Sequence, residues 1–404
     1  MPVIFHIDVN SAYLSWTAAE QLKNGAAVDL RSIPSIIGGD KKSRHGVVLA
    51  KSIPAKKYGI RTGEPVVNAF AKCPDLTMEP PDHKLYKEYS RRLMDFLCTY
   101  TERIEQVSVD ECYMDFTEAA KNYYSPAEGA MEIKNRVREL FGFTVNVGIS
   151  SNKLLAKMAS DFEKPDKIHT LYPEEIQVKM WPLPIGELYM AGRSSVEYLK
   201  KLEICTIGDL ARTDPHILTM HLKSHGRRLW EFANGIGNDH VEPEPAEAKG
   251  IGNSTTLPED LETEEEAEPV LRSLAESVSG RLRKAGQKAG MLSVEIKYYN
   301  FESVSHQKQL QKPVICVEDI CREALKLFEE LWDGRPIRLL GIRTSKLADE
   351  SEPEQMSLFD AGFQADVVKR AKKKKINDAL KKVQEKYGED IVIRGVKEKR
   401  LRNN

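Results

Sequence analysis

The sequence predicts an α+β protein built from several domains. The chain has 404 residues, enough for roughly two to four domains. Runs of alternating apolar residues, typical of strands, are interspersed with segments whose apolar residues recur at helical spacing. A stretch between residues 239 and 269 contains eleven Asp or Glu residues and one lysine. We therefore expect two globular parts of mixed secondary structure on either side of a solvated linker.

Composition argues against a membrane protein and against a disulfide-stabilised secreted domain. Hydrophobic residues make up 41% of the chain, and no apolar run reaches the roughly 20 residues of a membrane span. The amino-terminal apolar run contains Asp8 and lacks the basic start of a signal peptide. The six cysteines are scattered, without the paired spacing of a structural zinc site. We expect a cytoplasmic protein with no membrane association, whose cysteines are reduced core thiols.

Charge is distributed unevenly, although the net charge is only −1. Residues 38–61 contain seven Lys or Arg residues and one Asp. Residues 361–404 contain fourteen Lys or Arg residues and six Asp or Glu residues, a net charge of +8. Such clusters indicate a polyanionic partner, although a basic run is more often an ordinary solvated surface.

The first expected element is a strand over residues 4–7 that leads directly into Asp8. Its sequence, IFHI, is typical of a central strand, and a helix is expected from residue 11 to residue 16. An Asp at this junction usually caps the helix. Because Asn10 and Ser11 could also cap it, Asp8 is a candidate for a different role.

The second element, EQVSVDECYMD at residues 105–115, contains two adjacent carboxylates in an apolar setting. In one continuous strand, Val107, Val109, Glu111 and Tyr113 would share a face, and Asp110 would lie on the other. An Asp-Glu pair often marks only a strand edge or turn that faces water, and this alternative stays open. An unpaired carboxylate on an apolar surface costs several kcal/mol, however, and the stretch contains no Lys or Arg.

These two elements together predict a metal site. If the strand of Asp8 lies beside that of Asp110 and Glu111, three carboxylates meet at one edge of a sheet. Such an oxygen-rich group is what Mg²⁺ prefers. Two such ions can activate an attacking hydroxyl and stabilise a leaving pyrophosphate. Polymerase chemistry is therefore the leading hypothesis.

The third segment, VNVGISSNKLLAKMASDF at residues 145–162, predicts a strand followed by a helix. We expect a turn at Gly148 and a helix cap at Ser150 or Ser151. The expected inward face of the helix comprises Leu154, Leu155, Met158 and Ala159.

The second globular part is expected from residue 250 to residue 347. Four strand patterns, GIGNSTTL, MLSVEIKYYN, SVSHQKQL and PIRLLGIRTSKL, alternate with helical patterns around residues 267–284 and 317–332. This order predicts an α+β sandwich.

Four segments in order resemble the Y-family DNA polymerases, the translesion enzymes of the DinB and UmuC/ImpB/MucB type. They are FHIDVNSAYLSW, IIGGDKKSRHGVVLAKSIPAKKYGI, IEQVSVDECYMDF and VNVGISSNKLLAKMASDFEKPD. The similarity covers nearly the whole chain. It implies a right-hand polymerase with a palm, small fingers, a helical thumb and an α+β little finger domain.

The resemblance also implies domain boundaries. Residues 1–10 and 79–167 would form the palm, and residues 11–78 the fingers. Residues 168–238 would form a thumb with a helix-hairpin-helix, and residues 239–249 the linker. Residues 250–347 would form the little finger, and residues 348–404 a tail.

The resemblance implies roles for the carboxylates and for one aromatic residue. Asp8, Asp110 and Glu111 would be the catalytic residues and would bind two Mg²⁺ ions, with the backbone carbonyl of Val9 completing the site. Tyr13 matches the family's steric-gate aromatic, which excludes the 2′-hydroxyl of a ribonucleotide. Without the family context, Tyr13 would be interpreted as a residue packed on the sheet.

The fingers depart from the family pattern. Many members have a Thr followed by Tyr-Glu-Ala-Arg, where this chain has Ala50, Ile53, Pro54 and Lys56 at the corresponding places. Lys56 would contact the triphosphate with charge but without a planar guanidinium. Pro54 is compatible with the first turn of a helix. Lys164 matches a phosphate-contacting lysine, so we expect triphosphate binding, but weaker than in typical members.

Other resemblances concern contacts with DNA and with a sliding clamp. Residues 181–211 resemble the family's thumb hairpin, which presents a Gly-x-Gly to a DNA phosphate, but here that pattern is Met190-Ala191-Gly192. Gly192 would still allow close approach, and Arg193 could add a phosphate contact. In the little finger, Arg338 and Arg343 are candidate phosphate contacts, with solvated strand ends as an equally good alternative. In the tail, Gln355, Leu358 and Phe359 resemble the bacterial clamp-binding peptide. The basic segment after it could dock on the body, bind DNA or stay mobile.

The preferred function is a low-fidelity DNA polymerase that inserts deoxynucleotides opposite damaged bases. Its expected partners are primer-template DNA, deoxynucleoside triphosphates and the sliding clamp, and we expect a monomer. A nucleotidyl cyclase shares the palm carboxylates but needs no DNA-gripping domain or clamp peptide. A DNA- and clamp-binding protein without activity is a third possibility. No segment resembles a proofreading exonuclease.

Overall fold

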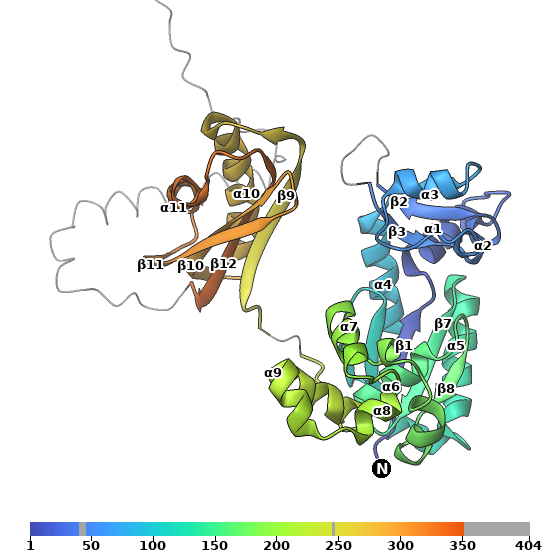
Figure 1. Cartoon of the computed structure of the whole chain (residues 1–404). Helices are drawn as coiled ribbons and strands as arrows, with labels where there is room; N and C mark the ends of the chain where they lie inside the picture. The colour runs from blue at the N-terminus through green and yellow to red at the C-terminus, as the bar shows by residue number, and fades with distance from the viewer. Residues whose placement is uncertain (40–45, 245–246, 351–404) are drawn as a thin grey trace, which may run out of the picture.

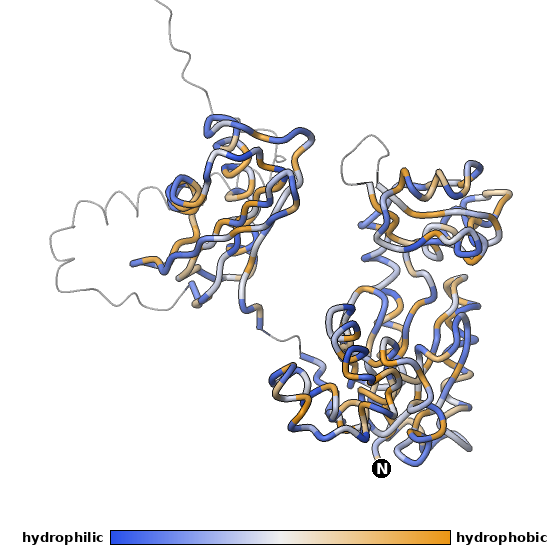
Figure 2. The backbone as a smooth tube through the Cα atoms, in the orientation of Figure 1, coloured by the Kyte–Doolittle hydropathy of each residue, from blue (hydrophilic) through white to orange (hydrophobic). Residues whose placement is uncertain are grey.

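The computed structural model describes residues 1–39, 46–244 and 247–350. This part of the chain contains three β-sheets, each covered by its own helices (Figure 1). Apolar segments run through all three sheets in Figure 2. Each sheet supports a separate hydrophobic core. The α+β class and multidomain organisation predicted from the sequence are confirmed.

The largest sheet has the strand order β5-β6-β1-β7-β8. The strands are β1 (Ile4–Val9), β5 (Ile104–Gln106), β6 (Glu111–Asp115), β7 (Val145–Ser150) and β8 (Ile168–Thr170). Central β1 pairs antiparallel with both β6 and β7, whereas β7 and β8 are parallel. The helices that pack on this sheet are α4 (His83–Leu97), α5 (Pro126–Phe141) and α6 (Lys153–Asp161).

Side-chain alternation along β1 separates a core face from a polar face. Phe5, Ile7 and Val9 belong to the core formed with α4 and α5. His6 and Asp8 point to the other face, where α6 lies against β1 and β7. Because Asp8 pairs with Glu111 across the β1–β6 ladder, both carboxylates lie on the α6 face.

The second sheet, with the order β3-β2-β4, is smaller. It contains β2 (Ser35–Gly38), β3 (Val48–Lys51) and β4 (Thr77–Glu79), with α2 (Ile53–Lys57), α3 (Val66–Lys72) and the long α1 (Ala12–Lys23). Pro54 lies in the first turn of α2, as expected, and Ser52 caps this helix by accepting from the amide of Ala55.

A group of helices follows β8. It comprises α7 (Arg193–Lys201), α8 (Ile207–Arg212) and α9 (Pro215–Ala233), which is interrupted at Lys223. Its core includes Leu154, Leu155 and Met158 of α6. Helix α6 therefore packs against the first sheet on one side and supports this helical group on the other.

The third sheet has the order β11-β10-β12-β9 and is entirely antiparallel. Its elements are β9 (Gly250–Leu261), α10 (Glu264–Lys284), β10 (Gln287–Tyr298), β11 (Ser303–Val314), α11 (Val317–Leu331) and β12 (Ile337–Asp349). The expected α+β sandwich is confirmed, since α10 and α11 share one hydrophobic core with the sheet.

Several local expectations are wrong. Residues 105–115 form two short strands joined by a turn that contains Asp110, so Val107 is 47% exposed instead of sharing a strand face with Glu111. Gly148 lies within β7 and not in a turn, and Asn152 caps α6 in place of Ser150 or Ser151. Not all cysteines are core thiols, because Cys98 and Cys205 are exposed. At residues 105–115 a turn outweighed the alternating pattern, and at Gly148 the close packing of α6 explains the glycine.

Within the ranges that the structure describes, no helix is both long and apolar enough to cross a membrane. The tail residues Gln355, Leu358 and Phe359 lie outside the described residues.

Candidate active site

The three predicted carboxylates meet at one end of the first sheet. Asp8 lies opposite Glu111 in the β1–β6 register, and the amide of Val9 donates to the carbonyl of Asp110 at 3.0 Å. Asp110 precedes β6 in the turn, where its Oδ1 accepts a 2.6 Å hydrogen bond from Ser108 Oγ. Ser108 Oγ also accepts from the amide of Glu111. Short-range hydrogen bonds in the turn thus fix the carboxylate of Asp110 and the backbone of Glu111.

Two lysines approach these carboxylates from the segment that contains α6. Lys157 Nζ lies 2.9 Å from Glu111 Oε2 and 3.7 Å from Asp8 Oδ2. Lys164 Nζ lies 2.5 Å from Asp8 Oδ2 and 2.9 Å from Asp161 Oδ1. Burial acts to lower the pKa of each lysine, but the surrounding carboxylates outweigh it and raise the pKa. Both ammonium groups therefore stay charged and balance the acids.

Glu111 is held in its ionised form. The imidazole of His6, whose Nε2 lies 3.4 Å from Glu111 Oε2, lowers the pKa most, burial opposes this, and Lys157 lowers it further, to about 2. His6 itself is fully buried, and its Nδ1 makes a 2.8 Å hydrogen bond with Ser160 Oγ. Burial lowers the pKa of His6, which favours a neutral imidazole at this place.

The donor set fits a hard divalent cation. Carboxylate oxygens of Asp8, Asp110 and Glu111 and the carbonyl of Val9 are the ligand types that Mg²⁺ accepts. In the described residues, no three or more His, Cys, Asp or Glu side chains form a metal-binding geometry. The Lys157 ammonium instead contacts two of the acids, and it supplies the positive charge that a cation would otherwise supply.

A cavity of about 770 Å³ opens beside the carboxylates, between the first sheet, the start of α1 and the β3–α2 corner. Asp8, Asp110, Tyr13, Lys56 and Lys164 all line it, whereas Glu111 lies outside its lining. The structure therefore brings the predicted metal ligands and the predicted nucleotide-binding residues to one place.

Tyr13 is fixed by aromatic neighbours at the wall of this cavity. Its ring stacks on Tyr86 with 4.3 Å between centroids and 6° between planes, and His83 lies edge-on to it. Burial and the nearby Asp110 carboxylate raise the pKa of Tyr13, so the phenol stays neutral. A neutral, rigid ring beside the carboxylates is a steric wall for any ligand in the cavity.

The predicted DNA contacts lie on the surface, away from this cavity. Gly192 is the amino-terminal cap of α7, but the positive φ of this loop falls on Met190. The Arg193 side chain is 93% exposed, with its Nε 2.9 Å from Glu197. The departure from the family's Gly-x-Gly pattern is therefore accommodated by a strained backbone at Met190.

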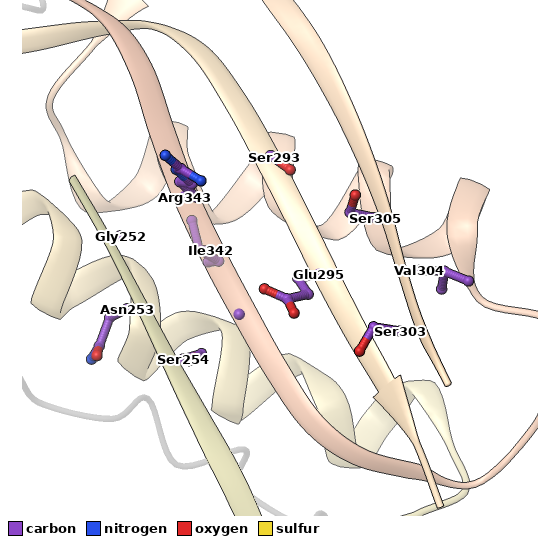
Figure 3. Close-up of a pocket in the computed structure, with 11 residues that line it drawn as sticks. Gly252, Asn253, Ser254, Ser293, Glu295, Ser303, Val304, Ser305, Ile342 and Arg343 are labelled. Carbon is purple, nitrogen blue, oxygen red and sulfur yellow. The ribbon is translucent and has the colours of Figure 1, made fainter. Parts of the chain in front are cut away.

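The open face of the third sheet carries a shallow polar hollow of about 570 Å³ (Figure 3). Arg343 and Glu295 lie in it, between strands rich in Gly and Ser, such as Gly252 and Ser305. Small residues let a partner approach the backbone closely. Arg338 lies elsewhere, with its guanidinium 4.6 Å above the ring of Phe301.

Sequence reasoning missed the residues that support the three acids, namely His6, Ser108 and Lys157, and a further acid, Asp161, that pairs with the lysines. The one available signal was Lys157, which interrupts the apolar face of LLAKMASDF, four residues before Asp161. A buried lysine on such a face requires an acidic partner.

Comparison with known proteins identifies the class of protein to which this chain belongs. The fold is that of a right-hand DNA polymerase, because a solved Y-family DNA polymerase chimera matches with a TM-score of 0.75. That match covers 86% of this chain and 99% of the other, at 22% identity. The chain belongs to the impB/mucB/samB family, the DinB-type Y-family DNA polymerases, whose models match residues 7–161 and, for the C-terminal domain, residues 248–358.

Full-length relatives agree with this assignment. DNA polymerase IV of Clostridium acetobutylicum is 48% identical over 98% of each chain. DNA polymerase IV 1 of Bacillus subtilis is 39% identical over 97% of this chain and 92% of its own. The chain is thus a DNA-directed DNA polymerase, and membership of the family implies dependence on a divalent metal. The nucleotidyl cyclase alternative is not supported.

Proposed function

We propose that this polymerase inserts deoxynucleotides opposite damaged bases with low fidelity, by phosphoryl transfer with two Mg²⁺ ions. The observation that carries the proposal is the group of Asp8, Asp110 and Glu111 at the edge of a cavity that Tyr13 and Lys164 also line. Helix α2, which adjoins the cavity, has only five residues, so few side chains are available there to check the shape of a new base pair.

In this proposal, charged side chains bind the metal ions and the triphosphate, and Tyr13 acts through the shape of its ring. Asp8, Asp110, Glu111 and the Val9 carbonyl would hold the ions, which would polarise the α-phosphate and the primer hydroxyl. Lys164 pairs with Asp8 and lines the cavity, which supports a contact of Lys164 with the triphosphate. Lys56 adds a second ammonium. Tyr13 would lie beneath the sugar and exclude a 2′-hydroxyl.

DNA would be held by parts distant from the chemistry. In this proposal Gly192 and Arg193 contact a phosphate from α7, and Arg338 and Arg343 contact the backbone from the third sheet. The predicted domain boundaries stand as a proposal alongside these roles.

Recruitment completes the proposal. Gln355, Leu358 and Phe359 would dock on the sliding clamp, in line with their position in the sequence after β12. Tethering raises the effective concentration of the enzyme at the primer end.

Primer extension by an Asp110→Ala variant tests the proposed chemistry. We expect extension on a template with an abasic site to fall at least about 100-fold, while DNA binding measured by fluorescence anisotropy is retained. Asp95→Ala, which removes an exposed acid on α4, is the control and should extend normally.

Equal extension by Asp110→Ala and the unsubstituted protein would refute the metal assignment. DNA binding without any extension by the unsubstituted protein would favour the alternative of an inactive DNA- and clamp-binding protein.

A further inference from the structure

Strand β3 carries Lys51, which lines the cavity and has no part in the proposed function. Along β3, Val48 and Ala50 are buried, whereas Leu49 and Lys51 alternate with them and remain half-buried. Lys51 lines the same cavity as Asp8, Asp110 and Lys164. It is the last residue of the strand, directly before the corner that leads into α2.

The position of the Lys51 ammonium is fixed by a hydroxyl instead of by an acid. Lys51 Nζ donates a 3.1 Å hydrogen bond to Thr62 Oγ1, and Thr62 also lines the cavity. The charge of Glu64 acts to raise the pKa of Lys51, but Glu64 is itself ion-paired with Lys72, with 2.5 Å between Oε2 and Nζ. In the described part of the chain, neither Lys51 nor Lys56 takes part in an ion pair.

The electrostatic surroundings of Lys51 are those of an anion site. Burial lowers the pKa of Lys51 most, and the positive charge of Lys56 lowers it further, against a smaller opposing effect of Glu64. Two ammonium groups that share a cavity without acids of their own repel each other. A polyanion in the cavity would remove this repulsion, and a solvated surface lysine has no such requirement.

Lys51 also lies where charge is lacking. Between residues 50 and 56, Ala50 and Ile53 are apolar, and Lys56 is the one cation besides Lys51. A lone ammonium cannot reproduce the two-pronged contact of a guanidinium with phosphate. Two ammonium groups can contact separate phosphate oxygens, so Lys51 would limit the weakening of triphosphate binding that the sequence predicts.

We propose that Lys51, oriented by Thr62 and acting with Lys56, binds the triphosphate of the incoming deoxynucleotide from the β3–α2 corner. This inference rests on the proposed function and assigns a further residue to its nucleotide site. The complementary contact comes from Lys164, on the segment that carries the partners of the carboxylates.

Single-nucleotide insertion kinetics on undamaged primer-template test the proposal. For Lys51→Ala we expect the nucleotide KM to rise about 10- to 100-fold, because a charge-assisted contact is lost, with kcat changed less than about threefold. Lys51→Arg should recover most of the affinity, since it keeps the charge. Lys57→Ala is the matched control, because Lys57 is exposed on α2 outside the cavity lining and should leave KM unchanged.

A binding measurement separates this inference from the proposed function. The probe is deoxynucleoside triphosphate added with Mg²⁺ to the enzyme on a primer that ends in a dideoxynucleotide. The Kd of Lys51→Ala should rise in parallel with KM, and thermal unfolding should show that the variant is folded. Normal KM and Kd in Lys51→Ala, or equal losses in Lys51→Ala and Lys51→Arg, would overturn the role of Lys51 and leave the polymerase intact. If the unsubstituted protein neither binds nucleotide nor extends, the proposed function fails instead.

Discussion

At the scale of single residues, the site depends on charge balance among buried and half-buried groups. Asp8 and Glu111 are paired across the β1–β6 ladder, and two neighbouring negative charges repel each other unless positive charges lie close to them. Lys157 and Lys164 supply that compensation, and Asp161 anchors both lysines at 3.5 and 2.9 Å. Glu111 can therefore stay ionised before any substrate arrives.

The ionisation of Glu111 leads to a prediction on stability. Its pKa is about 2 in the folded protein, below the usual 4.5, because of His6 and Lys157. The resulting stabilisation, at most about 3 kcal/mol, is fully present above pH 4.5 and is lost as the pH falls toward 2. In metal-free urea unfolding, the difference in free energy of unfolding between the unsubstituted protein and Glu111→Gln should therefore shrink from pH 6 to pH 3. A difference that stays constant over this range would contradict the assignment of the pKa.

Tyr13 leads to a prediction on sugar selectivity. Its ring is held by the stack on Tyr86 and cannot rotate away without losing that contact. Tyr13→Ala should lower the preference for deoxynucleotides over ribonucleotides about 100-fold, because space for the 2′-hydroxyl is created. Insertion of ATP and dATP opposite a template thymine measures this ratio. Tyr13→Phe keeps the ring and should keep the selectivity, and a loss in Tyr13→Phe would argue against a steric mechanism.

Among the secondary-structure elements, α6 links the carboxylates of the candidate active site to the first sheet and to the helical group. Its buried face packs on β7 and on the helical group, while Lys157 and Asp161 project toward the carboxylates. Helix α6 approaches β7 closely because residue 148 is a glycine. A Cβ atom at this position would lie 2.0 Å from the carbonyl oxygen of Ala156.

Gly148→Ala should therefore be strongly destabilising. The added methyl group must push α6 away from β7, at a cost of about 3 kcal/mol or more in the free energy of unfolding. Thermal and urea unfolding measure this loss. Gly280→Ala on α10 is the control, because a Cβ there meets nothing within 4 Å, and it should be neutral or stabilising by up to about 1 kcal/mol. Equal stability of the Gly148→Ala and unsubstituted proteins would show that α6 is not tightly seated.

The same element shows what the sequence could and could not predict. The apolar spacing of Leu154, Leu155 and Met158 predicts α6 and its buried face, and alternation predicts the strands of the third sheet. The sequence predicts α6 but not how closely it packs on β7, and this close packing is why a glycine lies within the strand at position 148. Lys51 was also not assigned a role, since its contact with Thr62 depends on how β3 meets the following loop. The periodicity of apolar residues predicts which side chains are buried. It does not predict which side chains contact each other in the folded protein, as Lys51 and Thr62 do.

At the scale of the whole molecule, Arg338 and Arg343, which are proposed to contact DNA, and the carboxylates proposed to carry out the chemistry lie on separate sheets. The carboxylates belong to the first sheet, and Arg343 to a third sheet with a core of its own. The segment after α9 joins them, and its Val241 is buried against Ile4 and Tyr113 of the first sheet. An enzyme that holds DNA through separate modules gains most when a further tether keeps it at the primer.

The proposed clamp-binding segment, which contains Gln355, Leu358 and Phe359, leads to the last prediction. Leu358→Ala with Phe359→Ala should remove the apolar contacts of the peptide and leave the catalytic site untouched. On primed circular DNA with a loaded clamp, we expect clamp-dependent extension to fall about 100-fold, because the gain in effective concentration is lost. Extension of a short primer-template without clamp should equal that of the unsubstituted enzyme, and Ser357→Ala should behave normally in both assays. Clamp stimulation that survives the double substitution would mean that the clamp contacts another surface of the chain, and a loss in both assays would place these residues in DNA binding instead.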